Sequence, residues 1–162
     1  VTRVHPEYIL FENLPGIEKI EDITPQFWEN RMEQMVNFEK HISLNGTKVL
    51  KFYFHMSKDE QRERLLKRLE NPEDNWKFST GDLKERALWD DYMKYYEEAI
   101  NKTSTDFAPW YIIPADDKGV ARYIVAKIIW EEMEKLTDIA EPELDPKVKA
   151  NIEEYRTQLK KM

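Results

Sequence analysis

The sequence contains no cysteine, which excludes disulfides, thiolate metal sites and cysteine nucleophiles within the chain. It has only four glycines, and they are widely separated. The motif G-x-x-x-x-G-K-S/T, whose backbone amides cradle phosphates, is therefore not found in these 162 residues. No apolar run is long enough to span a membrane, and the stretch VTRVHPEYIL lacks the pattern of a secretory signal. Together these absences predict a protein of a reducing compartment, the cytoplasm.

A basic excess is also missing, because the formal net charge is −7. Nucleic acids and anionic membrane surfaces both require a basic field on the protein, so neither is expected as a partner. Any site for a polyanion must then be a local basic pocket on an acidic body. The three histidines, His5, His41 and His55, have no metal-ligand spacing, and we predict no metal site made by them.

What the chain does contain is typical of a globular protein, with 41% apolar, 12% aromatic and 35% charged residues. Its length predicts one domain or part of one. Residues Val1 to Val4 have the composition of the end of a strand, followed by Pro6. We therefore expect the chain to start in the middle of a fold.

Helix start signals and apolar periodicity predict the order of the elements. Thr24 before Pro25 predicts a helix over 24–44, Ser57 with Glu60 one from Lys58 to Asn71, and the capping box of Ser79 and Asp82 one to about residue 101. Asp116 is expected to cap a further helix that ends near residue 136. Residues 137–145 are expected to form a linker, and residues 146–162 a terminal helix.

Two short runs that are apolar on both faces, KVLKFYFHMS and APWYIIPA, predict buried parallel strands. Strand, helices, strand and helix in this order indicate an α/β fold with a parallel sheet. Two strands are too few for such a sheet. We expect further strands from upstream of Val1 or from another chain, and therefore a homo-oligomer or a companion chain.

A charged helix and an aromatic loop form the candidate site. Arg64, Lys67 and Arg68 are expected to share one side of the helix from Lys58, and the loop NWKFS adds Trp76 and Lys77. Glu-to-cation pairs along this helix are typical of a solvated helix surface, and charge alone favours that interpretation over a ligand site. The loop between two capped helices favours a flap that closes over a phosphate ligand, which arginine binds in bidentate fashion.

Several stretches then resemble the carboxy-terminal half of family-2 polyphosphate kinases over residues 1–136. They are RVHPE, FWENRMEQMVNFEKHI, SKDEQRER, WKFSTGD, WDDY and PADDK. The resemblance implies a P-loop-kinase fold in which residues 58–101 form a helical lid. It further implies phosphate transfer between inorganic polyphosphate and ADP, AMP or GDP, with magnesium bridging the phosphates.

The resemblance also implies roles for individual residues. Arg68 and Arg64 are the expected catalytic cations, with Arg68 in the leading role. Lys77, Lys67 and Arg3 are expected to contact phosphate or polyphosphate. In PADDK, Asp117 and Lys118 fall near the expected nucleotide base, although helix capping is the better interpretation of Asp116 and Asp117.

Two departures from the family pattern are visible. The phosphate loop and the magnesium-binding aspartates are not in this chain and are expected upstream, so the chain alone is expected to be inactive. Asp74 stands where the pattern P-x-K-x-W-K has a basic residue.

Two alternatives stay open for the function of the chain. One is a non-catalytic helical interaction module, and the other is a different nucleoside monophosphate kinase.

Overall fold

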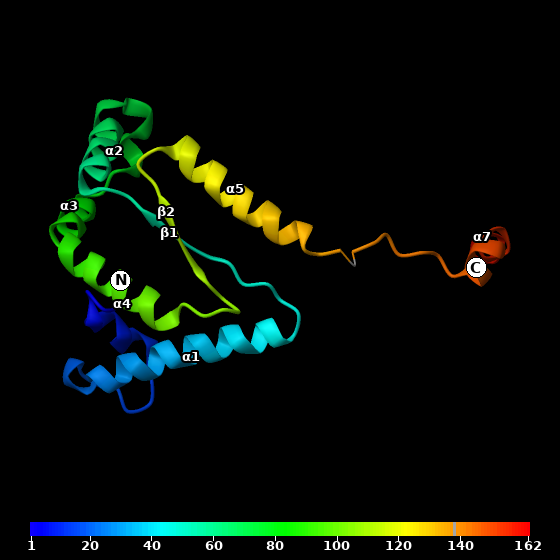
Figure 1. The fold of residues 1–162 in the computed structure, drawn as a ribbon, viewed down its shortest axis with the longest axis horizontal. Coiled ribbons are helices and arrows are strands. Elements are labelled where there is room, and N and C mark those ends of the chain that lie inside the picture. The colour runs from blue at the N-terminus through cyan, green and yellow to red at the C-terminus, as the bar shows by residue number, and fades with distance from the viewer. Residues whose placement is uncertain (138) are drawn as a thin grey trace. The chain divides into compact units, whose positions relative to one another are not determined.

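The computed structural model describes residues 1–137 and 139–162. It consists of two compact units, Val1–Val125 and Ala126–Met162, and α5 begins in the first and ends in the second. The elements of the first unit, drawn in Figure 1, are η1 (Pro6–Glu12), η2 (Ile20–Asp22), α1 (Pro25–Leu44), β1 (Lys51–His55), α2 (Lys58–Glu70), η3 (Pro72–Lys77), α3 (Thr80–Ala87), α4 (Trp89–Thr103), β2 (Trp110–Pro114) and the start of α5 (Lys118–Glu134).

The second unit contains the rest of α5, α6 (Pro146–Ala150) and α7 (Ile152–Lys160). The predicted terminal helix is thus two helices that meet at Asn151. A domain boundary at residue 136 stays a prediction. Among the described residues, no helix combines the length and the apolar character that crossing a membrane requires.

The sheet of the described residues has two strands, β1 and β2, which run parallel. Tyr53 pairs with Ile112 in the register, and Phe52 stacks on Tyr111 with ring centroids 5.5 Å apart. Ile113 is buried, whereas about half of the Ile112 side chain remains exposed. The predicted α/β fold with a parallel pair of strands is confirmed, and part of its apolar surface is open in this unit.

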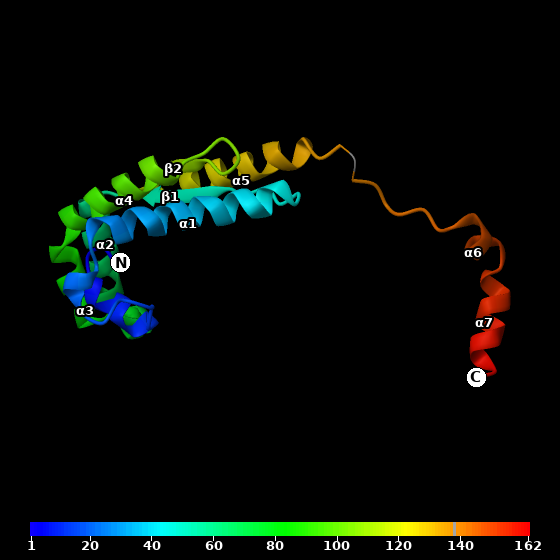
Figure 2. The same ribbon diagram turned by 90° about the horizontal axis from the view of Figure 1, so that it is seen from below.

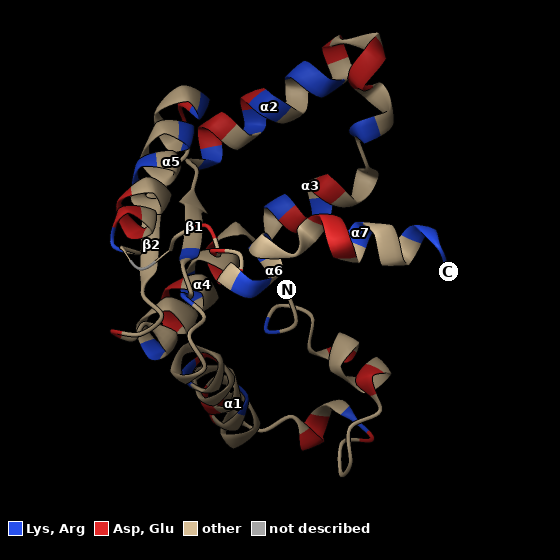
Figure 3. Cartoon of the chain, turned by 90° about the vertical axis from the view of Figure 1, so that its right-hand side faces the viewer, with Lys and Arg blue, Asp and Glu red and all other residues tan. Residues whose placement is uncertain are grey.

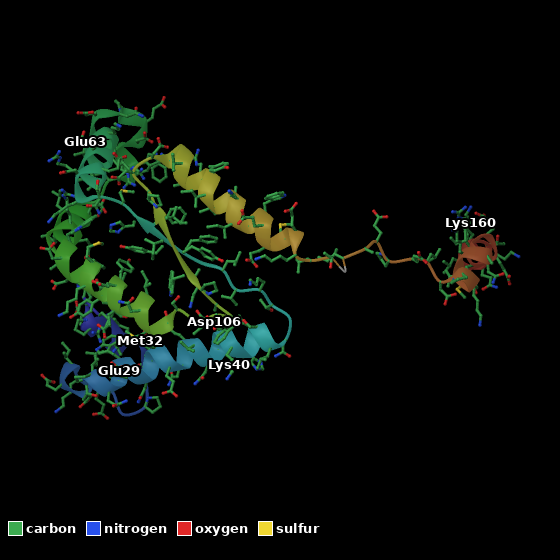
Figure 4. All side chains as sticks on the ribbon, viewed as in Figure 1. Glu29, Met32, Lys40, Glu63, Asp106 and Lys160 are labelled. Atoms are coloured by element: carbon green, nitrogen blue, oxygen red, sulfur yellow. The ribbon has the colours of Figure 1, made fainter. Side chains whose placement is uncertain are left out.

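Helix α1 packs on α4, as Figures 1 and 2 show. Lys102 of α4 forms an ion pair with Glu29, which Figure 4 labels on α1. Lys51 at the start of β1 ties the strand to both helices. Its Nζ donates to Glu39 Oε2 of α1 at 2.7 Å and to the carbonyl of Thr103, the last residue of α4, at 2.6 Å.

The predicted amino-terminal caps are present. Thr24 Oγ1 accepts from the amide of Phe27, and Ser57 Oγ accepts from the amide of Glu60. At α3, Ser79 and Asp82 form the reciprocal capping box. These caps are local in sequence, so the pattern of residues was sufficient to find them.

Three sequence predictions were wrong. The helix expected over 79–101 is interrupted at Leu88 and forms α3 and α4. Val1 to Val4 form a turn instead of a strand, because the amides of Val4 and His5 both donate to the Val1 carbonyl. Asp116 does not cap α5, and the capping carboxylate belongs to Asp117.

Candidate functional site

A cavity of about 730 Å³ lies beside the sheet in the first unit. The sheet and α4 contribute mainly apolar and aromatic side chains, and α2 and α3 contribute the polar ones. The polar and charged residues of its lining include Gln61, Arg64, Arg68, Asp82 and Glu85. Two guanidinium groups and two carboxylates therefore meet at one side of an otherwise largely apolar cavity.

Arg64 is the more firmly held of the two arginines. Its Nε donates to Glu60 Oε1 at 2.8 Å, and its Nη2 donates to the carbonyls of Ala115 at 2.7 Å and Asp116 at 3.1 Å. Its side chain is 22% exposed. Arg64 thus joins the second turn of α2 to the loop that follows β2.

Arg68 lies one turn further along α2 and is 43% exposed. Its Nη1 is 3.9 Å from Asp82 Oδ2, which is too long for a hydrogen bond and indicates a loose ion pair. Because the ion pair is long and the Arg68 side chain is partly exposed, its guanidinium can bind a ligand without losing a strong interaction in this structure. Figure 3 shows the basic and acidic bands that α2 carries along its length.

Lys67 does not share the side of Arg64 and Arg68. It is exposed and is not part of the cavity lining, whereas both arginines are. The expectation that all three cations lie together was therefore wrong for Lys67. Lys67 is turned by about 100° around the helix axis from its neighbour Arg68, so the cavity that Arg68 lines does not include it.

Lys77 and Trp76 form the tip of the segment between α2 and α3. Lys77 Nζ donates to Asp74 Oδ1 at 2.5 Å and lies 5.4 Å from the centre of the Trp76 ring. This hydrogen bond lowers the pKa of Asp74 below its ordinary value. The indole of Trp76 is 80% exposed. Asp74, the departure from the family pattern, thus holds the lysine of the same motif.

The three charged residues after β2 have separate positions. Asp116 Oδ1 accepts from the amide of Ser57 at 2.7 Å. Asp117 Oδ1 accepts from the amides of Gly119 and Val120 at 2.7 and 2.9 Å, and so caps α5. Lys118 is exposed in the first turn of that helix. Both carboxylates therefore have structural partners.

Arg3 is not brought to the cavity that Arg64 and Arg68 line. Its Nη2 donates to Glu98 Oε2 at 2.5 Å, and its guanidinium lies 5.1 Å from the centre of the Trp28 ring and 4.5 Å from that of Tyr95. These contacts join the first residues of the chain to α1 and α4. A phosphate contact by Arg3 would require it to leave Glu98.

Sequence reasoning did not find a network around Glu85. Glu85 Oε2 accepts from the Tyr92 hydroxyl at 2.5 Å and lies 3.0 Å from His5 Nε2. The hydrogen bond from Tyr92 lowers the pKa of Glu85, and the hydrogen bond with Glu85 raises the pKa of His5. His5 is 80 residues away from Glu85, so no local pattern could have connected them.

The described residues do not fit a metal site. Among them, no three carboxylate or imidazole side chains converge closely enough to hold an ion. The two carboxylates in the cavity lining, Asp82 and Glu85, are engaged by the Ser79 amide and by Tyr92 and His5.

Comparison with known proteins gives a consistent result. A family model described as Polyphosphate kinase 2 matches residues 11–141. The ADP-polyphosphate phosphotransferase of Rhodopseudomonas palustris is 45% identical over 99% of this chain, and the AMP/ADP-polyphosphate phosphotransferase of Meiothermus ruber is 46% identical over 74% of it. The chain spans about half the length of these curated relatives, 54% and 45% respectively.

The fold is shared as well. The crystal structure of polyphosphate kinase 2 from Arthrobacter aurescens superposes with a TM-score of 0.72 and 38% identity, over 79% of this chain and 46% of that one. The motifs, the matched family model and the common fold agree: the chain belongs to the polyphosphate kinase 2 family.

Proposed function

We propose that this chain is the lid-bearing part of a phosphotransferase that moves phosphate between inorganic polyphosphate and a nucleoside mono- or diphosphate. The observation that carries the proposal is the pair Arg64 and Arg68 on one side of the cavity, in a chain of this family. Similar proteins are named as phosphotransferases for ADP, AMP/ADP and nucleoside diphosphates.

In the proposed reaction, the bond between the terminal phosphorus of polyphosphate and its bridging oxygen breaks. A new bond forms between that phosphorus and a terminal phosphate oxygen of the nucleotide, and polyphosphate becomes one unit shorter. The transferring group spreads negative charge over its oxygens, and fixed cations stabilise that charge. Arg68 is the leading catalytic cation in this proposal because its head is the less engaged of the two. Arg64 supports it from the same side of the cavity.

The remaining contacts belong to the same proposal. Lys67 and Lys77 bind polyphosphate on the outer side of the lid, Lys77 after it leaves Asp74. Arg3 contacts phosphate after it leaves Glu98. Asp117 and Lys118 border the nucleotide, with Asp117 acting through the start of α5.

Two parts of the chemistry come from outside these residues. A P-loop is not found in the sequence, and we propose that another segment or a companion chain in an oligomer supplies it. The family implies magnesium, which would neutralise phosphate charge. Because the described residues do not fit a metal site, we assign its ligands to the substrates and to groups outside this chain. The absence of cysteine and the nucleotide substrates favour the cytoplasm as the location.

The test is transfer by the purified complete protein. Polyphosphate, magnesium and either ADP, AMP or GDP are supplied, and the nucleotide products are separated by chromatography. We expect a phosphorylated product with at least one nucleotide, and none from the 162-residue chain alone. No product with any of the three would overturn the proposal. Robust ATP formation by the short chain would show that no outside P-loop is needed.

A further inference from the structure

The loop after β2 meets the first residue of α2 through a carboxylate. Asp116 Oδ1 accepts from the amide of Ser57 at 2.7 Å, and Ser57 is the N-cap residue of α2. An N-cap amide has no acceptor within its own helix. Asp116 supplies that acceptor from another segment, 59 residues along the chain. Because the acceptor is charged, the hydrogen bond is stronger than one between neutral groups.

A second connection joins the same two segments, again with the donor on the α2 side and the acceptor on the loop. Arg64 in the second turn of α2 donates to the carbonyls of Ala115 and Asp116. The amide of Ser57 gives a hydrogen bond to the Asp116 side chain, and the side chain of Arg64 gives hydrogen bonds to the loop backbone. Two attachments on successive turns fix the direction of a helix as well as the position of its end.

The Asp116 carboxylate is engaged with the helix and not with the cavity. Asp116 is not part of the cavity lining, whereas Arg64 and Arg68 are. The backbone hydrogen bond from Ser57 lowers the pKa of Asp116, as expected for a carboxylate that accepts from a backbone amide. The neighbouring Asp117 caps a different helix, α5. Two adjacent carboxylates thus hold the starts of two helices.

We propose that Asp116 is a positioning residue, which sets the direction of α2 and through it the place of Arg68, without touching either substrate. This inference rests on the proposed function for its catalytic part. The contact with Ser57 is the fixed point of the lid, and the segment beyond Arg64 moves relative to it. The chemistry at Arg68 therefore depends on a carboxylate that lies on another segment of the chain.

Hydrogen exchange in the complete protein tests the contact itself. We compare Asp116→Ala, Asp116→Asn and the matched control Asp59→Ala. Unlike Asp116, Asp59 lies in α2 itself, in its first turn. Its side chain is 83% exposed, so its removal changes the net charge by the same amount without removing the tertiary contact. We expect amides 57–61 to exchange about tenfold faster in Asp116→Ala. The Asn variant keeps an acceptor oxygen and is expected to be intermediate, and the control unchanged.

Kinetics test the positioning role. In Asp116→Ala we expect kcat to fall about tenfold or more while KM for polyphosphate stays within about twofold, with partial recovery in Asp116→Asn. Unchanged hydrogen exchange at the amides of residues 57–61 would show that Asp116 does not hold the start of α2. Faster exchange with unchanged kcat would overturn the positioning role. An inactive wild-type protein would overturn the proposed function and the catalytic part of this inference, while the exchange data would still decide whether Asp116 holds α2.

Discussion

Helix α2 is held differently at its two ends. Its first two turns are attached to the loop after β2 through Asp116 and Arg64, and to α3 through Arg86, whose Nη1 donates to the Lys58 carbonyl at 2.6 Å and to Gln61 Oε1 at 2.8 Å. The far end and η3 are held mainly by bonds within the segment, such as those from Asn75 Nδ2 to the carbonyls of Arg68 and Leu69.

The two ends of α2 therefore differ in role, the base in stability and the tip in the proposed binding of phosphate. The hydrogen bonds at the base are tertiary, so they contribute to folding whether or not a ligand is bound. The cations at the tip have loose or local partners, so in the proposed function they can exchange those partners for phosphates. Mutations at the base should therefore act on stability, and on catalysis only through the position of Arg68, whereas mutations at the tip should act on catalysis directly. Three predictions test this distinction, and a fourth concerns a contact outside α2.

The largest expected effect is that of Arg68→Ala in the complete protein. We expect kcat to fall by about a hundredfold or more, because a cation that stabilises the transferring phosphate is lost. Steady-state kinetics with saturating polyphosphate give the value. Arg62→Ala is the matched control, since Arg62 pairs with Asp59 and Glu63 on the same helix and is not part of the cavity lining. Equal losses in the two variants would show that the assignment of faces is wrong.

Arg64→Ala should act mainly on stability. It removes two hydrogen bonds from a charged donor to backbone carbonyls, and we expect the free energy of unfolding to fall by about 2 kcal/mol. Chemical denaturation of the complete protein measures the change, with Arg68→Ala expected to stay within about 0.5 kcal/mol of the wild type. Similar destabilisation by both variants would remove the contrast between base and tip.

A smaller effect is expected from Asp74→Asn at the tip. It replaces the charged acceptor of Lys77 with a neutral amide oxygen, which weakens the hydrogen bond, and should lower KM for polyphosphate by about two- to fivefold, the range of a surface charge interaction. Glu73→Gln makes the same change in net charge on the same loop without touching the Lys77 contact. If both variants lower KM equally, the effect comes from the change of net charge on the loop and not from the Lys77 contact.

The smallest expected effect is the pH dependence of stability that comes from the joint of His5 and Glu85, the contact between their two side chains. The pKa of His5 is raised above its ordinary 6.5, so its contribution to stability is complete below about pH 6.5 and is lost as the pH rises through the raised value. The pKa of Glu85 is lowered, so its contribution does not change between pH 6 and 8.

His5→Gln should therefore reduce the fall in Tm between pH 6 and pH 8, and His41→Gln, at an exposed position of α1, should not. Thermal unfolding at both pH values provides the comparison. An unaltered pH dependence in His5→Gln would show that this joint does not contribute to stability.

A contact could be predicted from the sequence when its two residues lie close together along the chain. The caps at Thr24, Ser57 and Ser79 were predictable because the cap and its target are two or three residues apart. The two strands were predictable from their apolar faces. The place of Arg68 next to Arg64 followed from helical spacing alone.

Contacts between distant segments were not predictable in the same way. Asp116 and Asp117 are identical in type and adjacent in sequence, yet Asp116 accepts from the amide of Ser57 and Asp117 caps α5. The break at Leu88 has no proline or glycine to announce it. It separates α3, whose Glu85 contacts the distant His5, from α4. Tertiary contacts of this kind can override local propensity.

The attachment of α2 at one end gives the helix a mechanical property. Its 13 residues rise about 1.5 Å each, so its far end lies about 20 Å from its base. A rotation of about 20° around the base would move that end by about 7 Å, given this length. The same rotation displaces atoms next to the pivot by only a small fraction of that amount. If α2 moves as the proposed lid, a slight adjustment of a few hydrogen bonds at its base would therefore displace η3, which carries the exposed Trp76, by several times as much.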